Sequence, residues 1–125
     1  MSGNERYEVR KGYRGPVDIV AGLWDQSVTY LCEDLSPGGT FLKTSFPLSI
    51  GETVVCSFRL PGTSRDFDLF GKVTRVEMPR RKGDRGRTGM GVSFRGASAM
   101  ERLLIRSALR RVPPPVPEQL MLRAA

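Results

Sequence analysis

The chain has 125 residues, of which 39% are hydrophobic, so it is long enough for one domain with one modest core. It contains no histidine, which argues against a zinc site and leaves out the commonest general base at neutral pH. No apolar run approaches the length of a membrane span, and the polar, mixed-charge N-terminus does not resemble a signal peptide. We therefore expect a cytoplasmic monomer that does not insert into a membrane.

The formal net charge of +7 is unevenly distributed along the chain. Residues 80–111 contain ten Lys or Arg and two acids, whereas residues 1–79 contain nine basic and ten acidic residues. A basic second half favours an anionic partner, such as nucleic acid, a nucleotide or an acidic protein face. The two cysteines, Cys32 and Cys56, fall in alternating apolar stretches rather than at metal-ligand spacing, and we expect two buried thiols in a reducing cytosol.

The first part of the chain predicts a polar arm followed by three strands. Residues 1–15 are polar and show no period. Apolar residues then alternate over Pro16–Trp24, and after a hairpin turn the alternation continues from Val28 to Asp34. Beyond a second turn, Thr40–Lys43 predicts a short strand.

Three more strands are predicted in the second part. Val54–Leu60 alternates as a half-buried strand does. Phe67–Glu77 contains two apolar phases, which a bulge near Gly71 would reconcile. A long basic loop over residues 79–87 precedes a last strand at Met90–Phe94.

One helix follows the last strand. Ser98 can cap it, with Glu101 three residues on completing a capping box. An apolar stripe on one face is expected to plug the end of the sheet, and a groove for a partner is the alternative; the stripe consists of Met100, Leu103, Leu104, Ser107 and Ala108. Six strands with short turns and one helix predict a small antiparallel β-barrel. The expected division is a flexible arm (1–15), the barrel with its helix (16–111) and a proline-rich tail (112–125).

Two polar motifs flank the first predicted hairpin. Arg10 and Arg14 carry forked guanidinium groups that match phosphate oxygens or the O6 and N7 edge of guanine. Asp34 can accept the two adjacent donors of guanine's Watson–Crick edge, and Ser36 adds a hydroxyl. The turn over residues 37–39 lets a flat base approach the backbone. Taken alone, the first motif also fits a solvated arm and the second an Asx turn, but their combination favours a guanine nucleotide site.

These motifs carry a family resemblance. Residues 10–14 match R-x-x-x-R, and residues 34–39 match [D/N]-x-S-x-x-G. With both in register with the strand pattern, the chain resembles a PilZ domain, the bacterial receptor module for cyclic di-GMP. The similarity extends from Arg6 to Arg110 and includes the stretches GTFLKT, GETVVCSFRLPG, GKVTRV and GMGVSF.

The resemblance implies a six-stranded antiparallel barrel with a C-terminal helix, no catalytic activity and no cofactor, with cyclic di-GMP as ligand. Arg10 and Arg14 would hold phosphates and guanine edges. The residues implied to hold a guanine are Asp34, Ser36 and Gly39, and further candidates are Lys11, Gly38, Gly91 and Ser93. We expect no fused output domain, and therefore a downstream partner that is a separate, unidentified protein. Val9, just before the first motif, has no positive charge that could help to hold a second ligand, so we expect one ligand per chain.

Two other classes remain open. A small basic barrel can bind single-stranded nucleic acid on exposed aromatic side chains, but here only Trp24 and Tyr13 are expected at the surface. A ligand-independent interaction module of the same fold is the second alternative, although such modules lack motif residues that this chain has. An enzyme is disfavoured because no basic partner is apparent that would activate the Ser36 hydroxyl.

Overall fold

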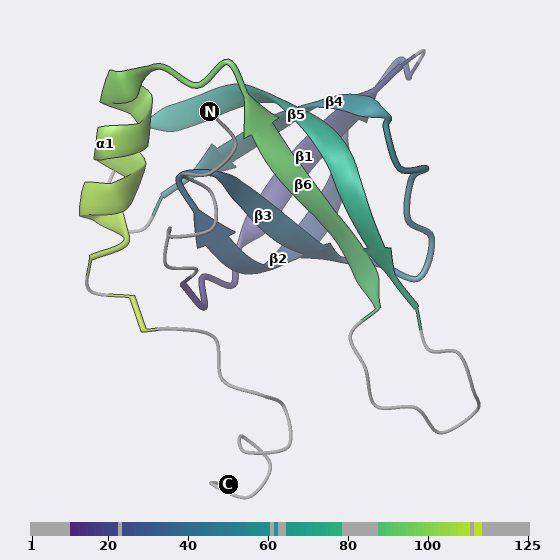
Figure 1. The fold of residues 1–125 in the computed structure, drawn as a ribbon, viewed down its shortest axis with the longest axis horizontal. Coiled ribbons are helices and arrows are strands. Elements are labelled where there is room, and N and C mark those ends of the chain that lie inside the picture. The colour runs from purple at the N-terminus through teal and green to yellow at the C-terminus, as the bar shows by residue number, and fades with distance from the viewer. Residues whose placement is uncertain are drawn as a thin grey trace, which may run out of the picture.

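The computed structural model describes residues 11–22, 24–60, 62, 65–78, 88–110 and 112–113. Within this part of the chain there are six strands and one helix: β1 (Pro16–Ala21), β2 (Val28–Ser36), β3 (Gly39–Lys43), β4 (Thr53–Arg59), β5 (Asp66–Glu77), β6 (Gly89–Arg95) and α1 (Ala99–Ala108). The strands form a closed barrel in the order β1-β2-β3-β6-β5-β4, and β4 pairs back onto β1. Every pairing is antiparallel, as predicted (Figure 1).

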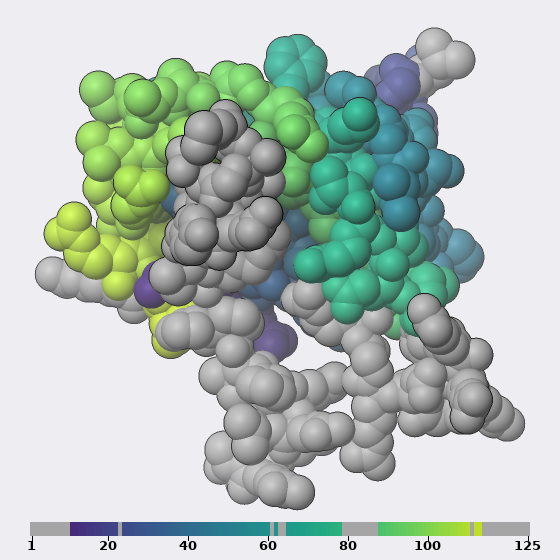
Figure 2. All heavy atoms as spheres, viewed as in Figure 1, coloured from purple at the N-terminus to yellow at the C-terminus, as the bar shows by residue number. Residues whose placement is uncertain are grey.

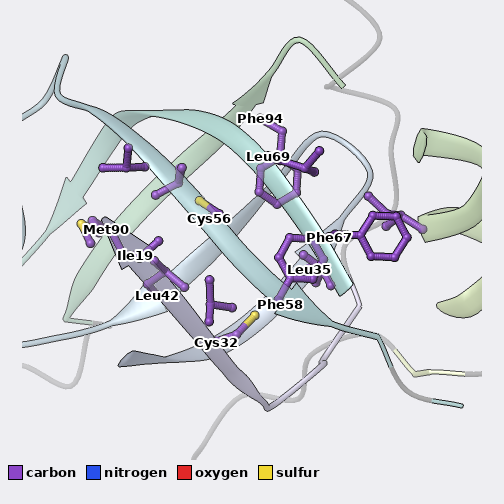
Figure 3. Packing of buried hydrophobic residues seen from close by; sticks show 14 of the residues in the cluster. Ile19, Cys32, Leu35, Leu42, Cys56, Phe58, Phe67, Leu69, Met90 and Phe94 are labelled. Carbon is purple, nitrogen blue, oxygen red and sulfur yellow. The ribbon is translucent and has the colours of Figure 1, made fainter. Parts of the chain in front are cut away.

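The barrel interior is filled by the alternating apolar residues that the sequence singles out. Side chains from all six strands meet there, among them Ile19, Cys32, Leu42, Cys56 and Met90 (Figure 3). Both cysteines are free thiols with no exposed surface, which confirms that they are buried. Closure removes the unpaired strand edges that would otherwise invite association with another chain.

Helix α1 covers one end of the barrel (Figure 1). Ser98 and Glu101 form the predicted capping box, with both hydrogen bonds at 3.0 Å. The predicted buried stripe is right only in part. Leu104 and Ala108 pack against the core, but Met100, Leu103 and Ser107 are exposed, and the helix residues that enter the core are Ile105 and Leu109. The rotation of a short helix about its axis depends on its fit to the barrel opening, and an apolar pattern on both sides of the helix leaves that choice open.

Two strand ends differ from the prediction by more than one residue. β1 ends at Ala21 rather than Trp24, because Gly22 has φ +44° and turns the chain, and the Trp24 N–H then donates to the Ala21 carbonyl at 2.9 Å. β2 continues past Asp34 to Ser36. Trp24 and Tyr13, both expected at the surface, are partly buried against the core.

The bulge in β5 lies between Val73 and Arg75 rather than near Gly71. Gly71 stays in the buried phase, where a Cβ would come within 2.5 Å of the Val92 Cγ1 atom. The extra residue at position 74 returns Val76 to a partly buried position, and Phe70 remains 63% exposed. The basic loop 79–87, the arm residues 1–10 and the tail beyond Pro113 lie outside the described residues. No helix among the described residues is long and apolar enough to cross a membrane.

Candidate ligand-binding site

A bulge in β2 decides which way the second motif faces. The register between β2 and β3 shifts between Cys32 and Asp34, so one extra residue separates them. Cys32 and Leu35 both lie in the core. Because side chains alternate along a strand, Asp34 and Ser36, on either side of Leu35, belong to the outer face of the barrel.

Strand register aligns the outer-face residues of four neighbouring strands into two rows. The first row crosses β2, β3, β6 and β5 through Asp34, Phe41, Gly91 and Arg75. The second row lies beside it and consists of Ser36, Gly39, Ser93 and Lys72. The barrel therefore brings together five of the residues proposed from the sequence, which come from three strands, and adds three that the sequence reasoning missed.

The turn between β2 and β3 is closed by the Ser36 side chain. Its hydroxyl accepts a hydrogen bond from the Gly38 N–H at 3.2 Å and donates to the Gly39 carbonyl at 3.4 Å. Residues Pro37 and Gly38 form the two-residue connection between the strands. The second motif thus has a structural role of its own, because its serine stabilises the hairpin that carries Asp34.

The glycines of the two rows differ in what surrounds them. A Cβ at Gly39 would meet the backbone carbonyl of Val92 on β6, so close pairing of β3 with β6 itself requires a glycine there. A Cβ at Gly91 would only reach ordinary contact with the Arg75 side chain, 3.4 Å away. Gly91 is therefore not required by a close backbone contact, and the Arg75 side chain lies over it.

Arg75 and Phe41 are two of the three residues in these rows that the sequence did not predict, and Lys72 is the third. The Arg75 guanidinium carbon lies 5.5 Å from the centroid of the Phe41 ring, a cation–π arrangement, and the Arg75 Nε atom contacts Glu77 Oε2 at 3.0 Å. Phe41 is fully buried although it lies on the outer face. Arg75 lies opposite Gly91 because the β5 bulge falls between Val73 and Arg75. No pattern in the sequence marks the position of that bulge.

Asp34 is buried, and its backbone carbonyl is hydrogen-bonded within the barrel. Its carbonyl oxygen accepts hydrogen bonds from the Thr40 hydroxyl at 2.9 Å and from the Cys32 thiol at 3.0 Å. Only 1% of the residue is exposed. A ligand can reach the Asp34 carboxylate only when the atoms that cover it move.

Residues 11–13 of the arm are hydrogen-bonded to three separate parts of the fold. The backbones of Lys11 and Leu35 form an antiparallel bridge next to Asp34. The Gly12 N–H donates to the Pro113 carbonyl at 2.7 Å, and the Tyr13 hydroxyl donates to the Arg59 carbonyl at 2.7 Å. Burial, and to a smaller extent Cys32, raises the pKa of Tyr13 above its usual value.

The first motif is described only in part. Arg14 lies on the surface, in the short segment that leads into β1. Arg10 falls outside the described residues. Lys11, between the two arginines, is half-buried and is joined to β2 through its backbone, so the described part of the first motif lies beside the strand that carries the second.

Comparison with known proteins establishes the family. The model of the PilZ domain family matches residues 4–111, and the chain belongs to this family. A PilZ domain is a domain of the cyclic di-GMP-binding type. No curated protein matched the chain.

Two solved structures share the fold. The structure of the Bacillus subtilis inhibitor of motility (MotI/DgrA) superposes with a TM-score of 0.66 at 21% identity, over 85% of this chain and 50% of that one. The PilZ domain of CeSA from a cellulose-synthesizing bacterium gives a TM-score of 0.55 at 24% identity, over 82% of this chain and 93% of that one. The chain thus spans about half the length of the first protein. The described residues contain no group of three or more His, Cys, Asp or Glu side chains that could hold a metal ion.

Proposed function

We propose that this protein is a non-catalytic receptor for cyclic di-GMP that passes its signal to a separate protein. The observation that carries the proposal is the pair of outer-face rows beside the described part of the arginine motif. Five residues named from the motifs and the last strand share that face, and the Lys11–Leu35 bridge joins it to the arm.

The chemistry of the face suits a guanine nucleotide. Asp34 supplies a carboxylate for the two donors on guanine's Watson–Crick edge, and charge-assisted hydrogen bonds of this kind are stronger than neutral ones. Gly39 and Gly91 add no side chains of their own to the adjoining surface, so a flat base can lie against it once the Arg75 side chain over Gly91 moves aside. Arg10 and Arg14 would bind phosphates and the other guanine edge in bidentate fashion.

Arg75 and Lys72 extend the face with positive charge at the β5 end of the two rows. A guanidinium that already lies over an aromatic ring is held in place, so it loses little freedom when it meets a base or a phosphate. We include Arg75 in the site for this reason. A face with cations toward both ends suits a ligand that carries two phosphates between two bases.

Burial of Asp34 suggests how binding becomes a signal. Because the whole Asp34 residue is 1% exposed, ligand entry requires a rearrangement of the atoms that cover it. Fixing a residue's backbone costs about 1–2 kcal/mol, which new arginine contacts can offset. Residues 11–13 are already hydrogen-bonded to the barrel, so we propose that ligand binding orders the residues before Lys11 and that the ordered segment is what a partner recognises.

A receptor fits the described chemistry better than an enzyme does. The only hydroxyl in the second motif, on Ser36, forms hydrogen bonds with the backbone of its own turn. Nucleophilic catalysis needs a general base within hydrogen-bonding distance of the nucleophile, and no such base is hydrogen-bonded to Ser36 in the part of the chain described.

Calorimetry with the purified full chain tests the proposal. We expect heat on addition of cyclic di-GMP, and none on addition of GTP or a single-stranded RNA oligonucleotide at moderate salt. Arg75→Ala should weaken binding about tenfold, as expected for loss of one charge-assisted contact. Arg95→Ala is the matched control, because Arg95 is an exposed arginine of β6 that pairs with Phe70 outside the two rows. Heat with RNA but none with cyclic di-GMP would overturn the proposal in favour of a nucleic-acid-binding barrel.

A further inference from the structure

Helix α1 has an apolar side that the core does not use. Ile105 and Leu109 fill the barrel end, yet Met100 and Leu103 are 62% and 52% exposed. With 3.6 residues per turn, Met100 shares a side of the helix with Leu104 and Ser107, and Leu103 lies beside Ser107. In the space-filling view the atoms of α1 form one border of the molecule, next to the strands (Figure 2).

A cavity of about 290 Å³ lies between this side of the helix and the strands β4 and β5. Its walls come from three places: the segment between β4 and β5, the start of β5, and the second half of α1. The lining residues are Leu60, Gly62, Arg65, Phe67, Leu104, Ser107 and Ala108. We call this cavity, together with the adjoining Met100 and Leu103, the helix groove.

The size of the helix groove suits a side chain of a partner protein. Pockets that hold drug-sized molecules range from about 300 to 1,000 Å³, and this cavity, at about 290 Å³, falls just below that range. Its base is apolar, because Leu60 and Phe67 belong to the hydrophobic core cluster and Leu104 and Ala108 pack against it. One large apolar side chain fits such a site in the way that anchor residues fill pockets at protein interfaces.

The charges around the helix groove select an acidic partner. The lining includes one cation, Arg65, and no acid among the described residues. The Arg65 guanidinium carbon lies 5.3 Å from the Phe67 ring centroid, so the charge sits directly above the apolar base. Arg110 is exposed one turn beyond Ser107.

We propose that the helix groove is the docking site for an acidic segment of a partner protein, anchored by one large apolar side chain. Its apolar base supplies the burial that fixes the anchor, and Arg65 and Arg110 attract the acidic flanks. The net charge of +7 acts in the same direction by steering an acidic partner toward the protein.

The hydrogen bonds of the arm connect the helix groove with the candidate ligand-binding face. The Tyr13 hydroxyl binds the carbonyl of Arg59, the residue before the groove-lining Leu60. The Gly12 N–H binds the Pro113 carbonyl, just beyond the end of α1. A movement of the arm around Arg10 and Arg14 would therefore act on both walls of the helix groove. This connection rests on the proposed function, whereas docking at the groove does not.

Selection of displayed random twelve-residue peptides on the immobilised full chain, without nucleotide, tests the docking site. We expect the enriched peptides to be acidic and to share at least one Leu, Met, Phe or Trp. The synthetic form of the strongest peptide, measured by fluorescence anisotropy, should lose at least tenfold in affinity when its apolar residue is changed to Ala. Enrichment of basic peptides, or of peptides without an apolar residue, would overturn the proposal.

Four variants test whether the peptide binds at the helix groove. Ser107→Trp fills the cavity from a solvent-exposed position, and Arg65→Glu reverses the charge at its rim; each should weaken the peptide at least tenfold. Ser107→Ala and Lys43→Glu are the controls, because the first leaves the cavity open and the second reverses an exposed charge on β3, a strand that contributes no lining residue; both should stay within twofold. Equal affinity for Ser107→Trp and the parent chain would overturn the proposal. The proposal would also be overturned if the parent chain bound no peptide but bound phosphatidylserine vesicles, and Arg65→Glu abolished that vesicle binding. The groove would then bind a membrane surface.

Addition of cyclic di-GMP to the same assay tests the connection separately. We expect peptide affinity to change at least threefold for the parent chain and not for Arg14→Ala. A peptide that binds the groove with unchanged affinity would overturn the connection and leave docking established. Absence of cyclic di-GMP binding in calorimetry would overturn the receptor function and leave the peptide result in place.

Discussion

Lys11 and Leu35 exchange both backbone hydrogen bonds, each 2.8 Å between nitrogen and oxygen. This pair fastens the residue after Arg10 to the strand between Asp34 and Ser36. Two motifs that are separated by about twenty residues of barrel in the sequence are thereby made neighbours. The arrangement explains why either motif is uninformative alone and why the pair forms one candidate site.

The ligand contacts can be tested one at a time. We expect Arg10→Ala, Arg14→Ala and Asp34→Asn each to weaken cyclic di-GMP binding by about 1.5–3 kcal/mol, which is about tenfold or more. Asn is chosen for Asp34 because the residue is 1% exposed, and a smaller side chain would leave a cavity. Calorimetry gives the affinities, and circular dichroism checks that each variant is folded. Arg106→Ala, on the helix, should leave binding unchanged; an equal loss there would show that only net charge matters.

Substitutions of the two site glycines, Gly39 and Gly91, should affect stability and ligand binding differently. A Cβ at Gly39 would meet the Val92 carbonyl, so Gly39→Ala should destabilise the barrel by about 1–3 kcal/mol, as overpacking does. At Gly91 the nearest atoms belong to the flexible Arg75 side chain, 3.4 Å from the added Cβ. Gly91→Ala should therefore cost less stability than Gly39→Ala, because the added Cβ makes only an ordinary van der Waals contact, and it should reduce ligand affinity by obstructing the site.

Urea denaturation and calorimetry measure the two effects. An unchanged midpoint for Gly39→Ala would contradict the close β3–β6 approach. Full ligand affinity for Gly91→Ala would remove the surface between Gly39 and Arg75 from the site.

Amide hydrogen exchange can show which part of the arm responds to ligand. The N–H groups of Lys11 and Gly12 are bonded to Leu35 and Pro113, so we expect them to exchange slowly before cyclic di-GMP is added. Protection gained on ligand addition should be largest before Lys11, and small in β4, which pairs on both sides within the barrel. Equal protection before Lys11 with and without ligand would contradict the proposed ordering of the arm.

The buried thiol of Cys56 predicts a loss of stability at alkaline pH. Burial, and then the neighbouring Cys32, raises the pKa of Cys56 from 9.0 to about 12. Between these values the unfolded chain loses the thiol proton while the folded chain keeps it, so the unfolded state binds fewer protons. The free energy of unfolding should therefore fall as pH rises through this window, by about 1.4 kcal/mol per pH unit from this one group.

Denaturation of the parent chain and of Cys56→Ala at pH 8, 9 and 10 isolates the effect, because the variant lacks only this ionisation. The parent curve should fall more steeply above pH 9. Parallel curves would show that the folded thiol ionises as readily as the unfolded one, which complete burial does not allow.

Local patterns in the sequence determined the elements of this protein. Alternating apolar residues defined all six strands, because one face of every strand meets a single core. Ser98 and Glu101 marked the start of the helix, because the capping box is a contact between residues three apart. The two motifs identified the family for the same reason: each is a short run of residues whose chemistry can be read without the fold.

Only the tertiary structure decided which residues share a face. The bulges before Asp34 and Arg75 each insert one residue into a strand, and a bulge's position depends on the pairing with the next strand rather than on composition. A shift of one residue moves every later side chain to the other face, which is why Arg75 and Phe41 were missed. The rotation of α1 about its axis could not be predicted from the sequence for a similar reason. The helix is apolar on two sides, and the fit of Ile105 and Leu109 into the barrel end left Met100 and Leu103 exposed beside the cavity of the helix groove.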